Sequence, residues 1–135
     1  MTALALQEQY TLGQLYSLAD QCSHEYPVTL AKKIELLSEI QIILGRKSAD
    51  AVREYKRIYA NRKRVYAEAY VMATKDKAQR AELAITDIRL VEADLEADKV
   101  RWCNAVLSND QVINALKYSM KVLLAEYQNP ANVNR

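Results

Sequence analysis

Glycine and proline are scarce in this chain of 135 residues, which contains only two of each. Because these residues form many of the tight turns in proteins, their scarcity indicates long helices joined by very short connections. Phenylalanine is absent, and the aromatic side chains are nine tyrosines and one tryptophan. Tyrosine buries its ring while its hydroxyl still reaches water or a partner, so it suits half-buried helix seams and contact surfaces.

Cysteine and histidine are also too few to suggest a catalytic or metal site. Cys22 and Cys103 lie far apart within helical patterns, and we expect reduced, buried thiols rather than a disulfide. His24 is the only histidine, and no second pair of metal-ligating residues accompanies it. The sequence has no glycine-rich phosphate loop and no nucleophile motif. We therefore expect no enzyme activity, no cofactor, no metal and no small-molecule substrate.

Charge and hydropathy point to no single class of partner. The net charge is +2, so the chain as a whole has no strong field that would require a nucleic acid or a membrane. No apolar run approaches the ~20 residues that span a bilayer, and no basic-then-apolar leader opens the chain. The sequence predicts a cytoplasmic protein without a membrane partner, in the host-cell cytoplasm if the protein is viral.

Apolar residues recur at helical spacing along most of the chain, and capping signals divide this pattern. Thr11 opens a capping box, Thr29 precedes the second pattern, Gly45 is a plausible stop, and Asp76 precedes the last pattern as a cap. The predicted helices cover residues 11–25, 29–44, 48–73 and 77–127, within a single domain that spans 1–127. Residues 128–135 are predicted to form a disordered tail.

The longest pattern is a heptad that runs from residue 81 to residue 127. Its two seam positions hold fourteen residues, of which eleven are apolar and three are polar. A helix with such a stripe packs the stripe against other helices. The polar seam residues are Glu92, Lys99 and Asn109. For Asn109 the sequence leaves two interpretations open, a residue that specifies register or oligomeric state and a tolerated edge residue. Glu92 and Lys99 are expected to extend outward toward solvent.

A short turn near residue 75 makes the third and fourth predicted helices antiparallel neighbours. Residues whose numbers add to about 150 then face one another, which places Arg62 near Asp87 and Arg53 near Asp98. Basic side chains of 53–64 would pair with carboxylates of 82–98, and such an array fixes the register of a hairpin. We therefore expect five residues to determine which helix seams pair: Arg53, Arg62, Asp87, Asp98 and Asn109.

The basic stretch has a second interpretation. Its side chains occupy more helical azimuths than one acidic helix can cover, so some of them face outward. Basic residues interleaved with tyrosines are typical of surfaces that hold phosphates and stack bases. The candidate partner or nucleic-acid face consists of Lys56, Arg57, Tyr59, Lys63, Arg64 and Tyr66.

Residues 55–127 resemble a loose group of small helical proteins encoded in bacteriophage and prophage early regions. The matching segments are Arg64-Val-Tyr-Ala-Glu-Ala-Tyr70, Ala78-Gln-Arg-Ala81 and the Glu/Ala-rich 90–97. The resemblance implies a helical hairpin and, where such genes lie beside recombination or replication genes, an accessory role near DNA or its enzymes. It assigns no catalytic residue.

The sequence therefore predicts an all-α protein, a long antiparallel helical hairpin of coiled-coil type with one or two shorter N-terminal helices. The expected function is non-catalytic: a protein–protein interaction factor that binds itself as a dimer or higher oligomer, another protein, or both. A phage-encoded accessory or inhibitor protein would fit this description. The alternatives are a nucleic-acid-binding module that uses the 53–66 face and a structural or scaffold oligomer.

Overall fold

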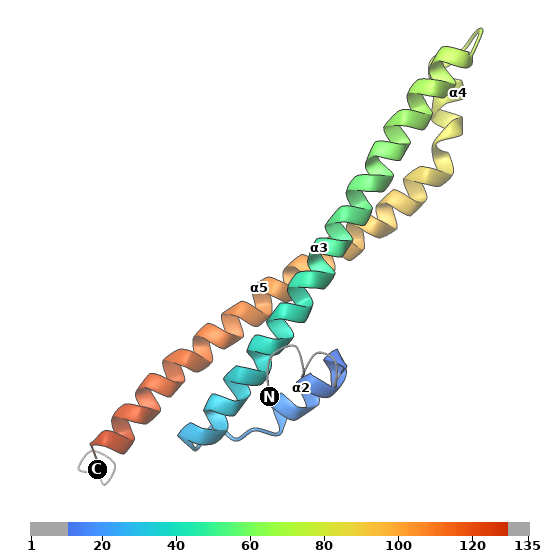
Figure 1. Cartoon of the computed structure of the whole chain (residues 1–135). Helices are drawn as coiled ribbons and strands as arrows, with labels where there is room; N and C mark the ends of the chain where they lie inside the picture. The colour runs from blue at the N-terminus through green and yellow to red at the C-terminus, as the bar shows by residue number, and fades with distance from the viewer. Residues whose placement is uncertain (1–10, 130–135) are drawn as a thin grey trace. The chain divides into compact units, whose positions relative to one another are not determined.

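The computed structural model describes residues 11–129, and the regular secondary structure within them is entirely helical (Figure 1). The helices are α2 (Leu12–Asp20), α3 (Pro27–Met72), α4 (Lys77–Ala84) and α5 (Thr86–Gln128). The prediction of an all-α fold built on a long antiparallel hairpin is confirmed. Most of the predicted tail, residues 130–135, lies outside the described residues, but Gln128 is still helical.

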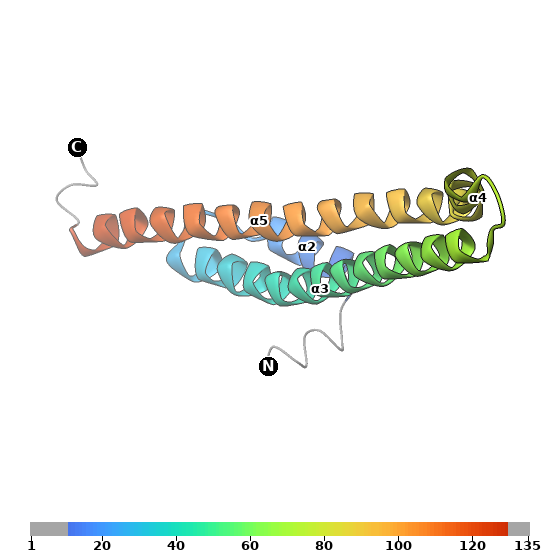
Figure 2. The same cartoon turned by 90° about the horizontal axis from the view of Figure 1, so that it is seen from above.

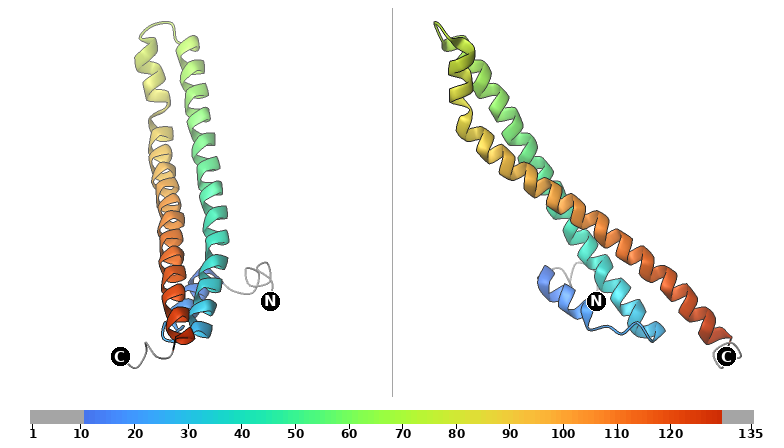
Figure 3. Two further views of the ribbon diagram at one scale, coloured as in Figure 1. Left: turned by 90° about the vertical axis from the view of Figure 1, so that its left-hand side faces the viewer. Right: turned by 180° about the vertical axis from the view of Figure 1, so that it is seen from behind.

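The chain forms two compact units, and α3 and α5 contribute residues to both. Unit 1 contains Met1–Gly45 and Ala105–Arg135, and unit 2 contains Arg46–Asn104. In unit 1, α2 lies beside the first part of α3 (Figures 1 and 2). In unit 2, the chain reverses after α3, so that α4 and the first part of α5 run back along α3 (Figure 3).

Unit 1 contains a conventional apolar core. Its α2 begins with the expected capping box, in which the Thr11 hydroxyl accepts a hydrogen bond from the Gln14 amide and the Gln14 side chain accepts one from the Thr11 amide. The buried hydrophobic side chains of this unit come from α2, α3 and α5: Leu15, Ala19, Leu30, Leu36, Leu37, Ile40, Leu44, Ile113 and Leu116. The predicted α5 seam therefore does face the other helices of the unit.

The predicted boundaries at the start of α3 are wrong. Helix α2 ends at Asp20, and α3 begins at Pro27 rather than after Thr29. Proline suits the first turn of a helix because its fixed φ is already helical and its missing N–H has no partner there. The Thr29 hydroxyl donates a hydrogen bond to Ser23 O at 2.7 Å, so it ties the connecting turn to α3 instead of capping the helix.

The predicted stop at Gly45 is also wrong, because α3 continues without a break through 46 residues. Gly45 has no positive φ, so it does not adopt the left-handed conformation with which glycine ends helices. The neighbouring Leu44 is buried, and packing of this apolar face outweighs the weak helix propensity of a single glycine.

At the hairpin turn the side chain of the N-cap residue does not cap α4. Asp76 occupies the N-cap of α4 with φ 51° and ψ 42°, and its side chain makes no capping hydrogen bond. Its carbonyl oxygen accepts the amide of Arg80 at 3.0 Å. Aspartate tolerates this left-handed conformation better than most residues, which explains why it fits the reversal.

The predicted helix 77–127 is interrupted at Ile85, where φ is −106° and ψ is 4°. The Thr86 hydroxyl donates a hydrogen bond to Glu82 O at 3.1 Å, four residues earlier. Back-bonding of this kind bends helices, and the β-branched pair Ile85-Thr86 is a weak helix former. Ile85 is fully buried, so the break lies at a core position of unit 2.

Candidate protein-interaction surface

Unit 2 buries few apolar side chains. All of its residues are described, and Ala81 and Ile85 are the only ones in its buried hydrophobic core. Several large apolar residues of the same unit are exposed, and their exposed fractions rise to 77% at Leu83 and 83% at Met72. The exposed members are Tyr59, Tyr70, Val71, Met72, Leu83, Leu90, Val91 and Val100. A surface of this kind is typical of a site that another molecule covers.

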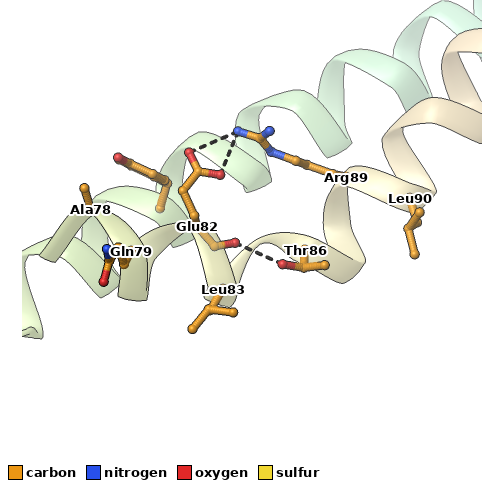
Figure 4. Close-up of a pocket in the computed structure, with 8 residues that line it drawn as sticks. Ala78, Gln79, Glu82, Leu83, Thr86, Arg89 and Leu90 are labelled. Atoms are coloured by element: carbon orange, nitrogen blue, oxygen red, sulfur yellow. Dashed lines mark hydrogen bonds and ion pairs between the residues drawn. The ribbon is translucent and has the colours of Figure 1, made fainter. Parts of the chain in front are cut away.

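A hollow of about 820 Å³ lies beside the break between α4 and α5. Tyr66 from α3, Leu83 from α4 and Leu90 from α5 contribute its largest apolar side chains. Leu83 and Leu90 are seven residues apart and point to the same side (Figure 4). The remaining lining residues are Ala78, Gln79, Glu82, Thr86 and Arg89. We name this set of eight residues the hairpin hollow.

An ion pair spans the helix break at the edge of the hairpin hollow. The Arg89 guanidinium Nη2 lies 3.0 Å from Glu82 Oε2 and donates a hydrogen bond to Glu82 Oε1 (Figure 4). Both side chains are about half exposed, so the pair contributes at most about 1 kcal/mol to stability. Its effect is geometric, since it joins the end of α4 to the first turn of α5.

Tyrosine rings extend the apolar surface along α3. The Tyr66 and Tyr70 rings stack with centroids 6.4 Å apart, and the Lys77 ammonium lies 5.7 Å from the Tyr70 centroid. Tyr66 was predicted to share a face with the basic residues, but it is half-buried and lines the hairpin hollow instead. Amphipathic rings of this kind are enriched in protein interfaces.

The predicted ion pairs across the hairpin are wrong, because the charged residues pair with other partners than those predicted. Arg62 forms an ion pair with Glu92 rather than with Asp87, which is exposed. Glu92 is four residues beyond the expected facing position Ile88, a shift of about one helical turn. The register as a whole is not displaced, since Ser48 Oγ still lies 3.3 Å from Cys103 Sγ, so the change of partner is local. Glu92 also does not extend into solvent as predicted, since its side chain is only 14% exposed.

Arg53 and Asp98 do not pair with each other either. Arg53 pairs with Asp50 at 3.0 Å and Asp98 pairs with Arg101 at 3.3 Å, both within one helix and both exposed. Neither residue lies in a seam. Lys99 is half-buried, and its ammonium lies 4.1 Å from the Tyr55 ring centroid. Within the described residues, therefore, a single ion pair joins α3 to α5.

Asn109 is the polar seam residue that the structure places in the core of unit 1, with 5% of its surface exposed. Its amide nitrogen donates to Leu37 O at 3.1 Å and to Gln41 Oε1 at 2.8 Å. Gln41 in turn donates to Val106 O at 3.2 Å. This hydrogen-bond network joins α5 to α3 at one position. It requires Asn109 to donate and Leu37 O and Gln41 Oε1 to accept.

Unlike Arg62, four other basic residues of α3 form no ion pair with α5 in the part of the chain that the structure describes. Lys56 and Arg57 are exposed and form no ion pair in the described part of the chain. The Lys63 ammonium lies 4.8 Å from the Tyr59 ring centroid, and Arg64 pairs with Glu68 one turn away. At 100° per residue, the side chains of Lys56, Arg57, Lys63 and Arg64 project from the outward half of α3. We call these four residues the basic face.

The local environment changes the titration of one seam tyrosine. Partial burial and the nearby carboxylates of Glu96 and Glu92 raise the pKa of the Tyr55 phenol above its ordinary value of 10.0. The Arg62 guanidinium opposes this shift, but more weakly. The neutral phenol is therefore the form that the folded protein favours.

Other candidate chemistry is limited in the part of the chain described. Cys22 and Cys103 are free thiols, and both are half-buried. Residues 11–129 contain no cluster of three or more histidine, cysteine or carboxylate side chains that could hold a metal ion. None of their helices carries an apolar stretch long enough to cross a membrane.

No protein-family model, no curated protein and no solved structure matches this chain. The resemblance to helical bacteriophage proteins therefore stays a prediction. Leu83 and Leu90, the exposed centre of the hairpin hollow, were not singled out from the sequence. Their signal was present: two leucines seven residues apart, outside both seam positions of the heptad.

Proposed function

We propose that this protein is a non-catalytic interaction protein that binds another protein through the hairpin hollow. The single observation that carries this proposal is the imbalance in unit 2, which buries Ala81 and Ile85 but exposes Leu83, Leu90 and Tyr70. Each Å² of apolar surface that stays in water lacks about 25 cal/mol of favourable burial free energy. A partner that covered these side chains would recover this free energy.

The chemistry of the hollow indicates the kind of partner. Its centre is apolar and aromatic, while Glu82 and Arg89 at its edge already neutralise each other. An amphipathic helix with a narrow apolar stripe fits such a surface, because large side chains at every third or fourth position fill the spaces between leucines. We propose a cytoplasmic role of this kind, and the phage-accessory resemblance is consistent with it.

The experiment compares capture of partners from the native cell by matched variants. The double variant Leu83→Glu, Leu90→Glu places charges in the centre of the hollow, and Val100→Glu is the control, since Val100 is an exposed apolar residue of the same unit outside it. We expect the wild-type protein and the control to capture the same protein and the double variant to lose it by more than tenfold. If all three capture identical sets, the proposal is wrong. Circular dichroism checks that each variant remains helical.

A second candidate function is nucleic-acid binding through the basic face. The specific observation is that Lys56 and Arg57 are exposed and form no ion pair with any residue of 11–129, whereas the sequence predicts an array of pairs across the hairpin. Four cations on one helical face would neutralise about four phosphates and make binding steeply salt-dependent.

This candidate is tested by titrating DNA and RNA at about 50 mM salt and then at higher salt. Replacing all four basic-face residues with alanine is expected to abolish binding. Replacing Lys32, Lys33, Lys75 and Lys121 with alanine removes the same charge from elsewhere and is expected to leave most of the binding. Absence of binding by the wild-type protein, or equal losses in both variants, would eliminate the nucleic-acid function.

A further inference from the structure

A second exposed stripe runs along α5 on the side away from the core of unit 1. Asn109, Ile113 and Leu116 are buried, and residues about 180° around the helix from them are exposed. This stripe consists of Leu107, Gln111, Asn114, Tyr118 and Val122, and we name it the outer stripe. Leu107 is 63% exposed, Tyr118 71% and Val122 45%.

The outer stripe has the composition of a helix–helix interface. Its residues are separated by three or four positions, and it spans about 24 Å of helix. None of its five members is charged, although charged residues make up 27% of the chain. Charge depletion with exposed aromatic and aliphatic groups is typical of the centre of an interface. An apolar stripe with amides at seam positions is a coiled-coil pattern in which the amides specify the partner and its register.

We infer that the outer stripe binds the outer stripe of a second copy of this chain, with the two helices antiparallel. In this register Leu107 packs on Tyr118 of the other copy, and Gln111 lies opposite Asn114. Each of these contacts occurs twice because the arrangement has a two-fold axis. The amides are self-complementary, since a carboxamide both donates and accepts hydrogen bonds.

The flanking charges favour this orientation. Asp110 and Lys117 lie seven residues apart along one edge of the outer stripe. Neither side chain forms an ion pair within the described residues; Asp110 accepts only a long hydrogen bond of 3.5 Å from Asn114. In the antiparallel register Asp110 of each copy lies beside Lys117 of the other, so two opposite-charge pairs form. A parallel pairing would not bring these two residues together.

This inference deepens the proposed interaction function by naming a second copy as one partner, but it uses a surface separate from the hairpin hollow. A single helix pair of this length lies at the small end of specific interfaces, so we expect affinity in the micromolar range. If the capture experiment at Leu83 and Leu90 fails, the self-association proposal still stands. If self-association fails, the proposal that the hairpin hollow binds another protein still stands. The two proposals are therefore tested separately.

The test is sedimentation equilibrium of the full chain at concentrations up to about 100 µM. We expect the wild-type protein to form a dimer and Leu107→Glu to weaken it by more than tenfold. Val112→Glu is the matched control, because Val112 is 47% exposed on the same helix but lies outside the outer stripe. The control is expected to dimerise as the wild type does.

A charge exchange then tests the register. Asp110→Lys alone and Lys117→Asp alone each place like charges side by side and are expected to weaken the dimer several-fold. The double variant Asp110→Lys, Lys117→Asp restores opposite charges and is expected to recover wild-type affinity. Asp110 and Lys117 are both exposed, so these substitutions do not put folding at risk. A monomeric wild-type protein, equal effects of Leu107→Glu and Val112→Glu, or additive losses in the double variant would overturn the inference.

Discussion

Asn109 joins α5 to α3 in unit 1 through two donated hydrogen bonds, to Leu37 O and Gln41 Oε1. Both partners are acceptors, so the position requires a donor rather than merely a polar residue. The sequence predicted a polar seam residue here but could not tell a register-specifying role from a tolerated one. The buried network favours the first, because a displaced register would leave the amide without partners in the core.

The substitution Asn109→Asp tests this requirement. Aspartate has nearly the same shape, but at neutral pH it presents acceptors to Leu37 O and Gln41 Oε1 and places a charge in the core. We expect a loss of about 3 kcal/mol in the free energy of unfolding, measured by urea denaturation. Asn104→Asp is the control, since Asn104 is exposed on the same helix, and its effect should stay below about 0.5 kcal/mol. Equal effects at the two positions would contradict the hydrogen-bond network.

Tyr55 makes stability depend on alkaline pH. Its pKa is raised in the folded protein by partial burial, Glu96 and Glu92, while in the unfolded chain it returns to its ordinary value of 10.0. A raised pKa contributes stability that is fully present below pH 10.0 and is lost as the pH rises through the folded-state value. We expect Tyr55→Phe to reduce the fall in unfolding free energy between about pH 9 and pH 11. An unchanged alkaline fall in this variant would show that Tyr55 does not titrate as described.

At the scale of the helices, the long periodic segments were predictable and their ends were not. The capping box at Thr11 was found from spacing alone, and the heptad placed Ile113 and Leu116 on the buried face. Gly45 does not end the helix as its propensity predicts, because the packing of the buried Leu44 beside it outweighs that propensity. Ile85 was missed because a heptad reports which face is apolar and is insensitive to one residue of changed backbone.

The candidate site was predictable only in part. The hairpin register predicted Arg62 near Asp87, whereas the carboxylate that pairs with Arg62 is Glu92, five residues farther along the chain. Arginine has a long side chain, so periodicity alone does not tell which of several nearby carboxylates it selects. The hairpin hollow lies beside the interruption at Ile85, and its position cannot be read from periodicity because the apolar pattern continues through the interruption.

Gly45→Ala tests the continuity of α3. Space is open around a Cβ at this position, so alanine meets no obstruction. Because the residue lies inside a helix, alanine should raise the free energy of unfolding by about 1 kcal/mol, measured by thermal or urea denaturation. Gly13→Ala, in the first turn of α2, has equally open surroundings and should give a smaller gain. A loss of stability in Gly45→Ala would indicate that the chain breaks there after all.

At the scale of the whole molecule, the apolar side chains are divided unevenly between the two units. Unit 1 encloses a core of leucine and isoleucine from three helices, whereas unit 2 encloses Ala81 and Ile85 and leaves its larger apolar groups at the surface. Folding alone does not account for this distribution, because exposed leucines and tyrosines add nothing to a core. We propose that a partner protein at the hairpin hollow covers the exposed apolar groups of unit 2.

Photo-crosslinking in the native cell tests the proposed interaction most directly. A photoreactive phenylalanine analogue replaces Leu83 in the hairpin hollow, and in a matched protein it replaces Ala60, which is exposed on α3 outside the hollow. The account predicts one predominant crosslink to another protein from position 83, several-fold stronger than any from position 60. Crosslinks of equal strength from the two positions, or none from position 83, would contradict it.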